Sequence, residues 1–151
     1  MKEPVWVSRE VVLAAHDEML AEHGGRSGIR DEGLLDSALE RPRNLFLYEK
    51  PTIFELASAY AFGISKNHPF IDGNKRAAFL TTYIFLGRNG WLLSAPEVEA
   101  TVKTLQLASG QISESEFAIW LEHFKKQCSR SERGFFGSGK ALAKEHARSG
   151  L

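Results

Sequence analysis

Apolar residues recur at helical spacing between Ile53 and Ile64, and this run limits the possible folds more than any other part of the chain. Its members stand at i, i+3, i+4, i+7, i+8 and i+11, which is the pattern of one buried helix face. They are Ile53, Leu56, Ala57, Tyr60, Ala61 and Ile64. The largely apolar stretch AAFLTTYIFLGR at residues 77–88 indicates a second, buried helix. We therefore expect a central helix, a short polar loop and a helix from about Asn74 to Arg88.

Helix-capping residues indicate four more helices. Serine and aspartate side chains accept hydrogen bonds from the free N–H groups at a helix start, and proline commonly stands at the first helical turn. We expect helices to begin after Ser8, Asp31, Pro96 and Ser113, the last with a capping box that includes Glu116.

Turn residues indicate where the helices stop. Gly24–Gly25 should end the first helix, and Pro42 should end the second. The stretch Asn44–Thr52 has two aromatic residues and a proline without helical spacing, so we expect a loop or a small hairpin there. Val5–Val7 should be a short strand or an extended entry to the fold. The chain is predicted to be all-α, a helical bundle with at most a small β-hairpin.

Composition limits the class of protein. The 151 residues are 43% apolar, and 19 basic and 19 acidic residues cancel to zero formal net charge. A neutral chain has no overall field that would draw it to nucleic acid or to an anionic membrane, so we expect neither as a direct partner. The N-terminus MKEPVWVSRE has no apolar signal core, and the single Cys128 cannot form an intramolecular disulfide. We expect a cytoplasmic protein.

The composition changes after Cys128 to a run rich in glycine, serine and charge. We expect one catalytic domain over residues 1–128 and a polar, partly disordered tail over residues 129–151. Within the tail, Gly134–Ala141 (GFFGSGKA) nearly matches the phosphate-binding pattern G-x-x-x-x-G-K-[S/T]. Ala141 lacks the hydroxyl that would bind Mg²⁺ and no strand precedes the segment, so we expect no nucleotide there.

The loop between the two central segments, HPFIDGNKR at residues 68–76, gathers the chemically active side chains. His68 is the candidate general base, because an imidazole can accept a hydroxyl proton near neutral pH. Asp72 is the candidate Mg²⁺ ligand, since proteins usually hold Mg²⁺ by one or two carboxylates together with phosphate oxygens and water. Aspartate also caps helices, and that role would compete for the same oxygens.

The second half of the motif is expected to bind phosphate. Gly73 permits a sharp turn, and Gly73, Asn74 and Lys75 offer successive N–H groups at a helix start. Lys75 and Arg76 add two cations that oppose the helix dipole, which indicates that an anion normally occupies the site. Phe70 should anchor the loop in the core. A base, a metal ligand and a phosphate cradle together suggest phosphoryl or nucleotidyl transfer.

This motif resembles the signature of the Fic/Doc family, His-Pro-Phe-x-(Asp/Glu)-Gly-Asn-Gly-Arg-x-x-Arg. It has Lys75 in place of a glycine and Phe79 in place of the last arginine. The Asn-Lys-Arg ending is similar to that of the Doc branch, as are GIRDEGLLDSALERPRN at residues 28–44 and FELASAYAFGISKN at residues 54–67. The resemblance covers most of the chain and implies the helical Fic/Doc fold.

The resemblance also implies ATP and Mg²⁺ as cofactors. In Fic enzymes the glycine leaves room for the phosphates and AMP is transferred to a target hydroxyl, whereas in Doc toxins a lysine fills that space and the γ-phosphate is transferred. Lys75 and Phe79 therefore favour a Doc-type protein kinase, a toxin that phosphorylates a threonine of elongation factor Tu and stops translation. The alternatives are a Fic-type protein adenylyltransferase with a variant motif and a catalytically silent binding module.

Two expectations concern partners. The self-inhibitory helix of the family has the pattern [S/T]-x-x-x-E-[G/N]; the only Glu followed by Gly or Asn here is Glu32, and Gly28 stands at the Ser/Thr position. We therefore expect inhibition by a separate antitoxin chain. We also expect the segment Asn44–Thr52 to dock the target protein through an exposed β-edge.

Overall fold

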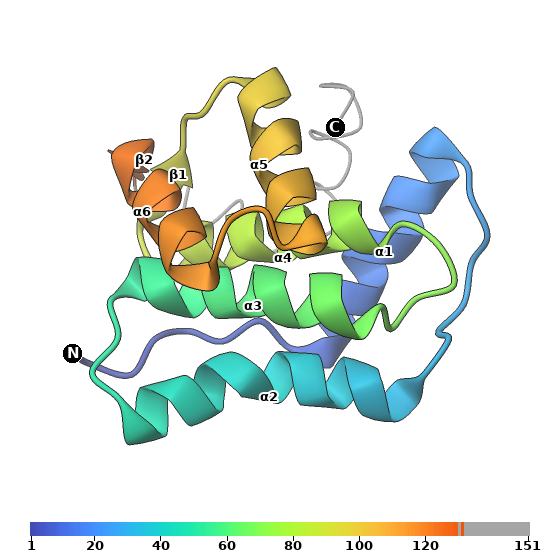
Figure 1. Ribbon diagram of the computed structural model, residues 1–151, viewed down its shortest axis with the longest axis horizontal. Helices are drawn as coiled ribbons and strands as arrows, with labels where there is room; N and C mark the ends of the chain where they lie inside the picture. Colours follow the sequence, from blue (N-terminus) through green and yellow to red (C-terminus); the bar gives the residue numbers. More distant parts are fainter. Residues whose placement is uncertain (130, 132–151) are drawn as a thin grey trace.

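The computed structural model describes residues 1–129 and 131, and in them the chain forms helices and one small sheet (Figure 1). The helices are α1 (Arg9–His23), α2 (Glu32–Tyr48), α3 (Ile53–Asn67), α4 (Asn74–Arg88), α5 (Glu97–Ser109) and α6 (Glu114–His123). The strands are β1 (Trp91–Leu93) and β2 (Lys125–Gln127). The prediction of an all-α fold with a small β element is confirmed. Apart from Ser129 and Ser131, the predicted tail and its Gly134–Ala141 segment lie outside the described residues.

Helix α3 forms the centre of the bundle. It lies between α2 and α4, and α6 packs on it as well (Figure 1). Its residues Leu56, Tyr60 and Ile64 are fully buried, as their spacing predicts. Full burial of one large apolar side chain contributes roughly 1.5–3 kcal/mol, so this face of α3 holds the bundle together. Neither α3 nor any other helix in the described part of the chain has the length and apolarity to cross a bilayer.

The helix starts follow the predicted caps. The side-chain oxygens of Ser8, Asp31 and Ser113 each accept a hydrogen bond from the N–H of the third residue of their helix. Thr52 and Glu55 form a further capping box at the start of α3. Helix α4 differs, because Gly73 precedes it and no side chain caps it.

Helix α2 is longer than predicted. It continues through Pro42 to Tyr48, so the predicted end at Pro42 is wrong, and of the loop predicted over Asn44–Thr52 only residues 49–52 form a connector. Pro42 removes one helical hydrogen bond. However, Pro42 is buried, and Leu45 and Phe46 beyond it pack against the core alongside α3. The free energy gained by burying this face outweighs the cost of the hydrogen bond that Pro42 removes. Because residues 44–48 present a helix surface, the predicted β-edge is wrong there, and docking of a target on Asn44–Thr52 stays a prediction.

The small sheet joins two segments that are distant in sequence. Strand β1 pairs antiparallel with β2, with Leu92 opposite Lys126. The next residue after β2, Cys128, is buried and its N–H donates to the carbonyl of Gly90 (2.9 Å). The β element of this fold therefore follows α4 and is completed by the chain after α6.

Candidate active site

The polar motif forms the loop between α3 and α4, as predicted. Helix α3 ends at Asn67, and His68 follows it in a left-handed conformation, with φ 53° and ψ 53°. Among the described residues, His68 is the only one other than glycine with a positive φ. Such a conformation costs about 1–3 kcal/mol and persists where surrounding contacts hold it.

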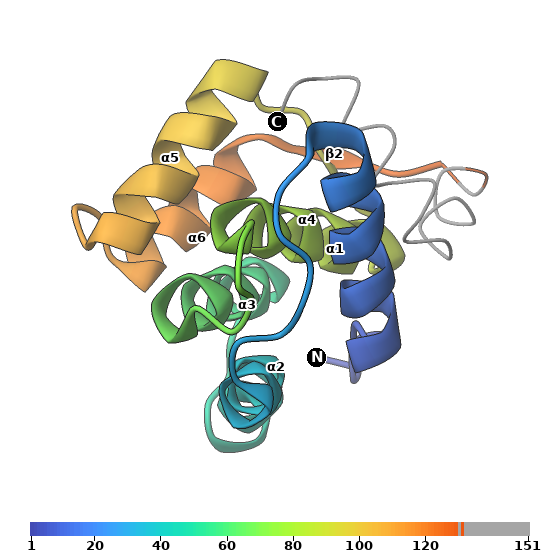
Figure 2. The same ribbon diagram turned by 90° about the vertical axis from the view of Figure 1, so that its right-hand side faces the viewer.

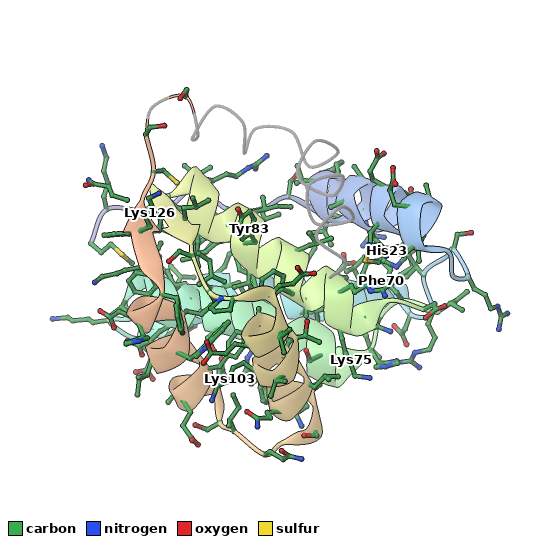
Figure 3. All side chains as sticks on the ribbon, turned by 90° about the horizontal axis from the view of Figure 1, so that it is seen from above. His23, Phe70, Lys75, Tyr83, Lys103 and Lys126 are labelled. Carbon is green, nitrogen blue, oxygen red and sulfur yellow. The ribbon has the colours of Figure 1, made fainter. Side chains whose placement is uncertain are left out.

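Phe70 anchors the loop, as expected. Its side chain is fully buried, and its ring stacks on the imidazole of His16 in α1, with 3.8 Å between the ring centres. In Figure 3, Phe70 lies beside α1, near the end that carries His23. The loop is therefore fixed between α1 on one side and the α3–α4 pair on the other.

The buried Asn74 side chain connects Phe70 to His68. Its Oδ1 accepts from the N–H of Phe70 and its Nδ2 donates to the carbonyl of Phe70, both at 2.9 Å. These two backbone contacts fix the orientation of the amide, so the Nδ2 group also donates to His68 Nδ1, 3.1 Å away. A neutral His68 then carries its proton on Nε2. The Asn74 side chain is occupied in this way, and the contact with phosphate predicted for Asn74 is through its backbone N–H.

Asp72 presents its carboxylate next to the start of α4. Oδ1 accepts from the N–H of Gly73 (2.8 Å), and Oδ2 accepts from the N–H of Arg26 (3.2 Å). The carboxylate does not cap α4, so the capping role does not compete with metal binding. Within residues 1–129 and 131, no cluster of three or more acidic, histidine or cysteine side chains could hold a metal. One carboxylate completed by phosphate oxygens and water suits Mg²⁺, so the residues present fit this ion together with a nucleotide.

The first turn of α4 is open to an anion. Gly73 has φ 76°, and a Cβ at this position would lie 2.7 Å from Met19 Cε, so only glycine fits without displacing a neighbour. The turn has no acidic residue, and Lys75 and Arg76 are exposed. Neither cation forms an ion pair with an acidic residue in the described part of the chain. Free N–H groups and unpaired cations at a helix start favour a phosphate.

All six predicted site residues line one cavity of about 360 Å³. They are His68, Asp72, Gly73, Asn74, Lys75 and Arg76. A second cavity of about 600 Å³ shares two of these residues, His68 and Lys75, and extends to α5. Its other lining residues include Ser65, Val102, Leu105, Gln106 and Ser109. Both volumes fall within the range of about 300–1,000 Å³ that is typical of small-molecule sites.

Two residues that contact the loop were not predicted as part of the site. Arg30 donates from its guanidinium group to the carbonyls of His68 and Asn67. His16 Nε2 lies 2.7 Å from the carbonyl oxygen of Asp72 and donates to it. The GIRD segment resembled the family pattern, but neither residue has a local sequence signal for its contact.

Burial sets the protonation of His16. The pKa of this imidazole is lowered below its ordinary value of 6.5 chiefly by desolvation, which the hydrogen bond to the Asp72 carbonyl and the nearby charges of Asp17 and Asp72 oppose. A neutral His16 has one N–H, and the contact with Asp72 places it on Nε2. His16 therefore supports the loop as an uncharged donor.

The chain is similar to known proteins over a range that includes this site. A family model described as "Fic/DOC family" matches residues 6–86, a range that includes the whole motif. "Protein kinase doc" of Escherichia phage P1 is 33% identical over 114 residues, which cover 74% of this chain and 89% of that protein. "Toxin Doc" of Mycolicibacterium smegmatis is 36% identical over 92 residues, covering 60% of this chain and 68% of that protein.

Proposed function

Because the chain belongs to the Fic/DOC family, we propose that it is the toxin of a toxin–antitoxin system and acts as a protein kinase. In this proposal it transfers the γ-phosphate of ATP to a hydroxyl group of a target protein. The observation that carries the proposal is Lys75, an exposed cation in the first turn of α4 that lines both cavities beside His68. One similar protein is named a protein kinase and another a toxin, which supports both parts of the proposal.

The proposed reaction needs a proton acceptor, and we assign this role to His68, which lines the same cavity as Asp72 and Lys75. The target hydroxyl oxygen forms a bond to the γ-phosphorus, the bond to the β–γ bridging oxygen breaks, and ADP leaves. The hydroxyl proton passes to the imidazole. Since Nδ1 is the unprotonated nitrogen, a proton accepted there removes the hydrogen bond from Asn74. Proton transfer to Nδ1 therefore requires this hydrogen bond to break.

The remaining motif residues bind the nucleotide in this proposal. Mg²⁺ bound with ATP would neutralise charge on the phosphates, and Asp72 is the residue that would hold it. The backbone N–H groups of the first turn of α4, together with Lys75 and Arg76, hold the phosphate oxygens. The dipole of α4 adds to this attraction. Fixing the phosphates and the hydroxyl in line is the main contribution that a protein makes to phosphoryl transfer.

Two side chains favour phosphate transfer over AMP transfer. Lys75 occupies the position where the Fic pattern has a glycine, and a long cation there changes how a polyphosphate fits. Phe79 stands where the Fic pattern has its last arginine, and it is buried with its ring stacked near Tyr83. The site therefore lacks the second arginine of the adenylyltransferase pattern. Protein adenylylation is the second candidate function, since the other motif residues are common to both reactions.

The partners follow from the proposed function. We infer an antitoxin that acts in trans, because one similar protein is named a Doc toxin and this chain has no self-inhibitory pattern. The proposed target is a threonine of elongation factor Tu, whose modification would arrest translation.

The proposed function is tested with ATP that is labelled at either the α- or the γ-phosphate. Purified protein and a bacterial lysate are incubated with each label, and the labelled proteins are separated. The proposal expects γ-label in a protein of the translation machinery and no α-label. Transfer of the α-label would favour the adenylyltransferase, and no transfer with retained growth arrest would favour a binding module.

A further inference from the structure

We propose that Arg30 is a positioning residue that holds the main chain of His68 in its reactive conformation. The Nε of Arg30 donates to the His68 carbonyl at 2.7 Å, and one terminal nitrogen donates to the Asn67 carbonyl at 2.9 Å. One planar guanidinium thus binds two successive carbonyls at the point where α3 ends. The inference rests on the proposed function, in which His68 accepts the hydroxyl proton.

The backbone around Arg30 is hydrogen-bonded to the same loop, the one that joins α3 to α4. The N–H groups of Arg30 and Asp31 both donate to the carbonyl of Pro69, at 2.6 Å and 3.1 Å. The N–H of Ile71 donates to the carbonyl of Gly28 at 3.1 Å. Figure 2 shows the α1–α2 linker passing across the loop that joins α3 to α4. Arg30 therefore reaches His68 from a backbone that is already fixed against the loop, so its side chain needs no large rearrangement.

His68 needs such support because its backbone conformation is unfavourable. A side chain disfavours the left-handed region, and a residue before proline favours extended conformations. His68 is left-handed and precedes Pro69. Without a contact on its carbonyl, the main chain of His68 would relax toward the extended region. That movement would carry the imidazole away from the cavity it shares with Asp72 and Lys75.

Arg30 and Asn74 divide the task. Before proton transfer, Asn74 binds the ring of His68 through Nδ1 and fixes its rotation. Arg30 binds only backbone carbonyls, so it fixes the peptide planes from which that ring projects. Arg30 forms no ion pair with an acidic residue in the described part of the chain, and the acceptors it does have lie at the negative end of the α3 dipole. Its charge is therefore directed at the end of α3 and not at a surface carboxylate.

The chemistry of arginine suits this contact better than that of lysine. A guanidinium group has several N–H donors in one plane and can reach two carbonyls at once, whereas an ammonium group acts as a point charge without a preferred plane. We therefore expect Arg30→Lys to retain one contact at most, and Arg30→Met to retain none while keeping an unbranched, largely apolar stem.

The chain offers a matched control in Arg9. This arginine of α1 pairs with Glu32 and Asp36 in the first part of α2 and makes no contact with the loop. Arg9→Gln removes a partly exposed arginine whose two ion pairs lie away from the loop. The experiment measures kcat, the KM for ATP and the melting temperature of Arg30→Met, Arg30→Lys and Arg9→Gln.

Arg30→Met should lower kcat by about 10²-fold, the typical cost of a small misplacement of a reacting group, with little change in the KM for ATP. The kcat of Arg30→Lys should lie between those of Arg30→Met and the wild type. Arg9→Gln should keep the wild-type kcat even if its melting temperature falls. A wild-type kcat in folded Arg30→Met would overturn the inference. So would a kcat loss in Arg9→Gln equal to that in Arg30→Met, because it would show a general effect of stability.

A second readout does not depend on activity. The ¹³Cα and backbone ¹⁵N signals of residues 67–70, and the ring signals of His68, report the local conformation by nuclear magnetic resonance. We expect them to shift in Arg30→Met and to stay in place in Arg9→Gln. If the wild type transfers nothing from ATP, the proposed function fails while these spectra still test the contact. Unshifted His68 signals in Arg30→Met would refute the positioning role.

Discussion

Replacement of Asn74 by alanine should show how far the fold depends on one side chain of the motif. Asn74 is buried and satisfies both backbone groups of Phe70, a residue with no exposed surface. Asn74→Ala would leave a buried N–H and a buried carbonyl without partners, at about 1–3 kcal/mol each. We therefore expect the free energy of unfolding to fall by about 2–6 kcal/mol. Typical domains have about 5–15 kcal/mol of stability, so the variant should still fold.

Asn67 supplies the control for this experiment. It stands at the other end of the same loop, and its Nδ2 makes one partly buried hydrogen bond, to the carbonyl of Leu34 (2.9 Å). Asn67→Ala should cost only about 0.5–1.5 kcal/mol. Urea unfolding followed by circular dichroism measures both variants. Equal destabilisation by the two substitutions would refute the reasoning, because it would mean that the Phe70 backbone does not depend on Asn74.

Three further outcomes follow from the site. His68→Ala should lower transfer by about 10²–10⁴-fold and leave the melting temperature near that of the wild type, because the residue is exposed; a variant with normal transfer would exclude His68 as the base. Asp72→Ala should abolish the gain in ATP affinity that Mg²⁺ gives in calorimetry, and an undiminished gain would place the metal elsewhere. Burial lowers the pKa of His16 below 6.5, so the unfolded chain binds a proton at this residue more readily than the folded chain does. The contribution of His16 to stability is therefore full above pH 6.5 and is lost as the pH falls from 6.5 to the lowered pKa. Compared with the wild type, His16→Gln should lose less stability over that range, and equal losses would contradict the assignment.

The helix starts and the central helix could be predicted because their signals are local. A serine or aspartate that caps a helix acts within three residues, and the apolar face of α3 shows directly in its spacing. The length of α2 could not be predicted in the same way. Pro42 is a strong local signal for a helix end, but the burial of Pro42, Leu45 and Phe46 along α3 is a tertiary effect that the local pattern does not contain.

The site shows the same division between local and distant contacts. Its six predicted residues fall within nine positions, so the turn at Gly73 brings them to one cavity. Arg30 and His16 reach the loop from 38 and 56 positions away, respectively. Neither has a local sequence pattern that predicts the contact, because the partner of each lies in a distant segment of the chain. The pairing of β1 with β2 is similarly a contact between distant segments.

The central proposal is that the motif beginning at His68 transfers a phosphate to a protein hydroxyl. The most direct test is tandem mass spectrometry of the modified target after incubation with ATP and Mg²⁺, with the His68→Ala variant as the background. We expect one target residue with a hydroxyl group to gain a phosphate in the presence of the wild type and to stay unmodified with His68→Ala. A target that gains adenosine monophosphate at that residue would contradict the proposal and identify the protein as an adenylyltransferase.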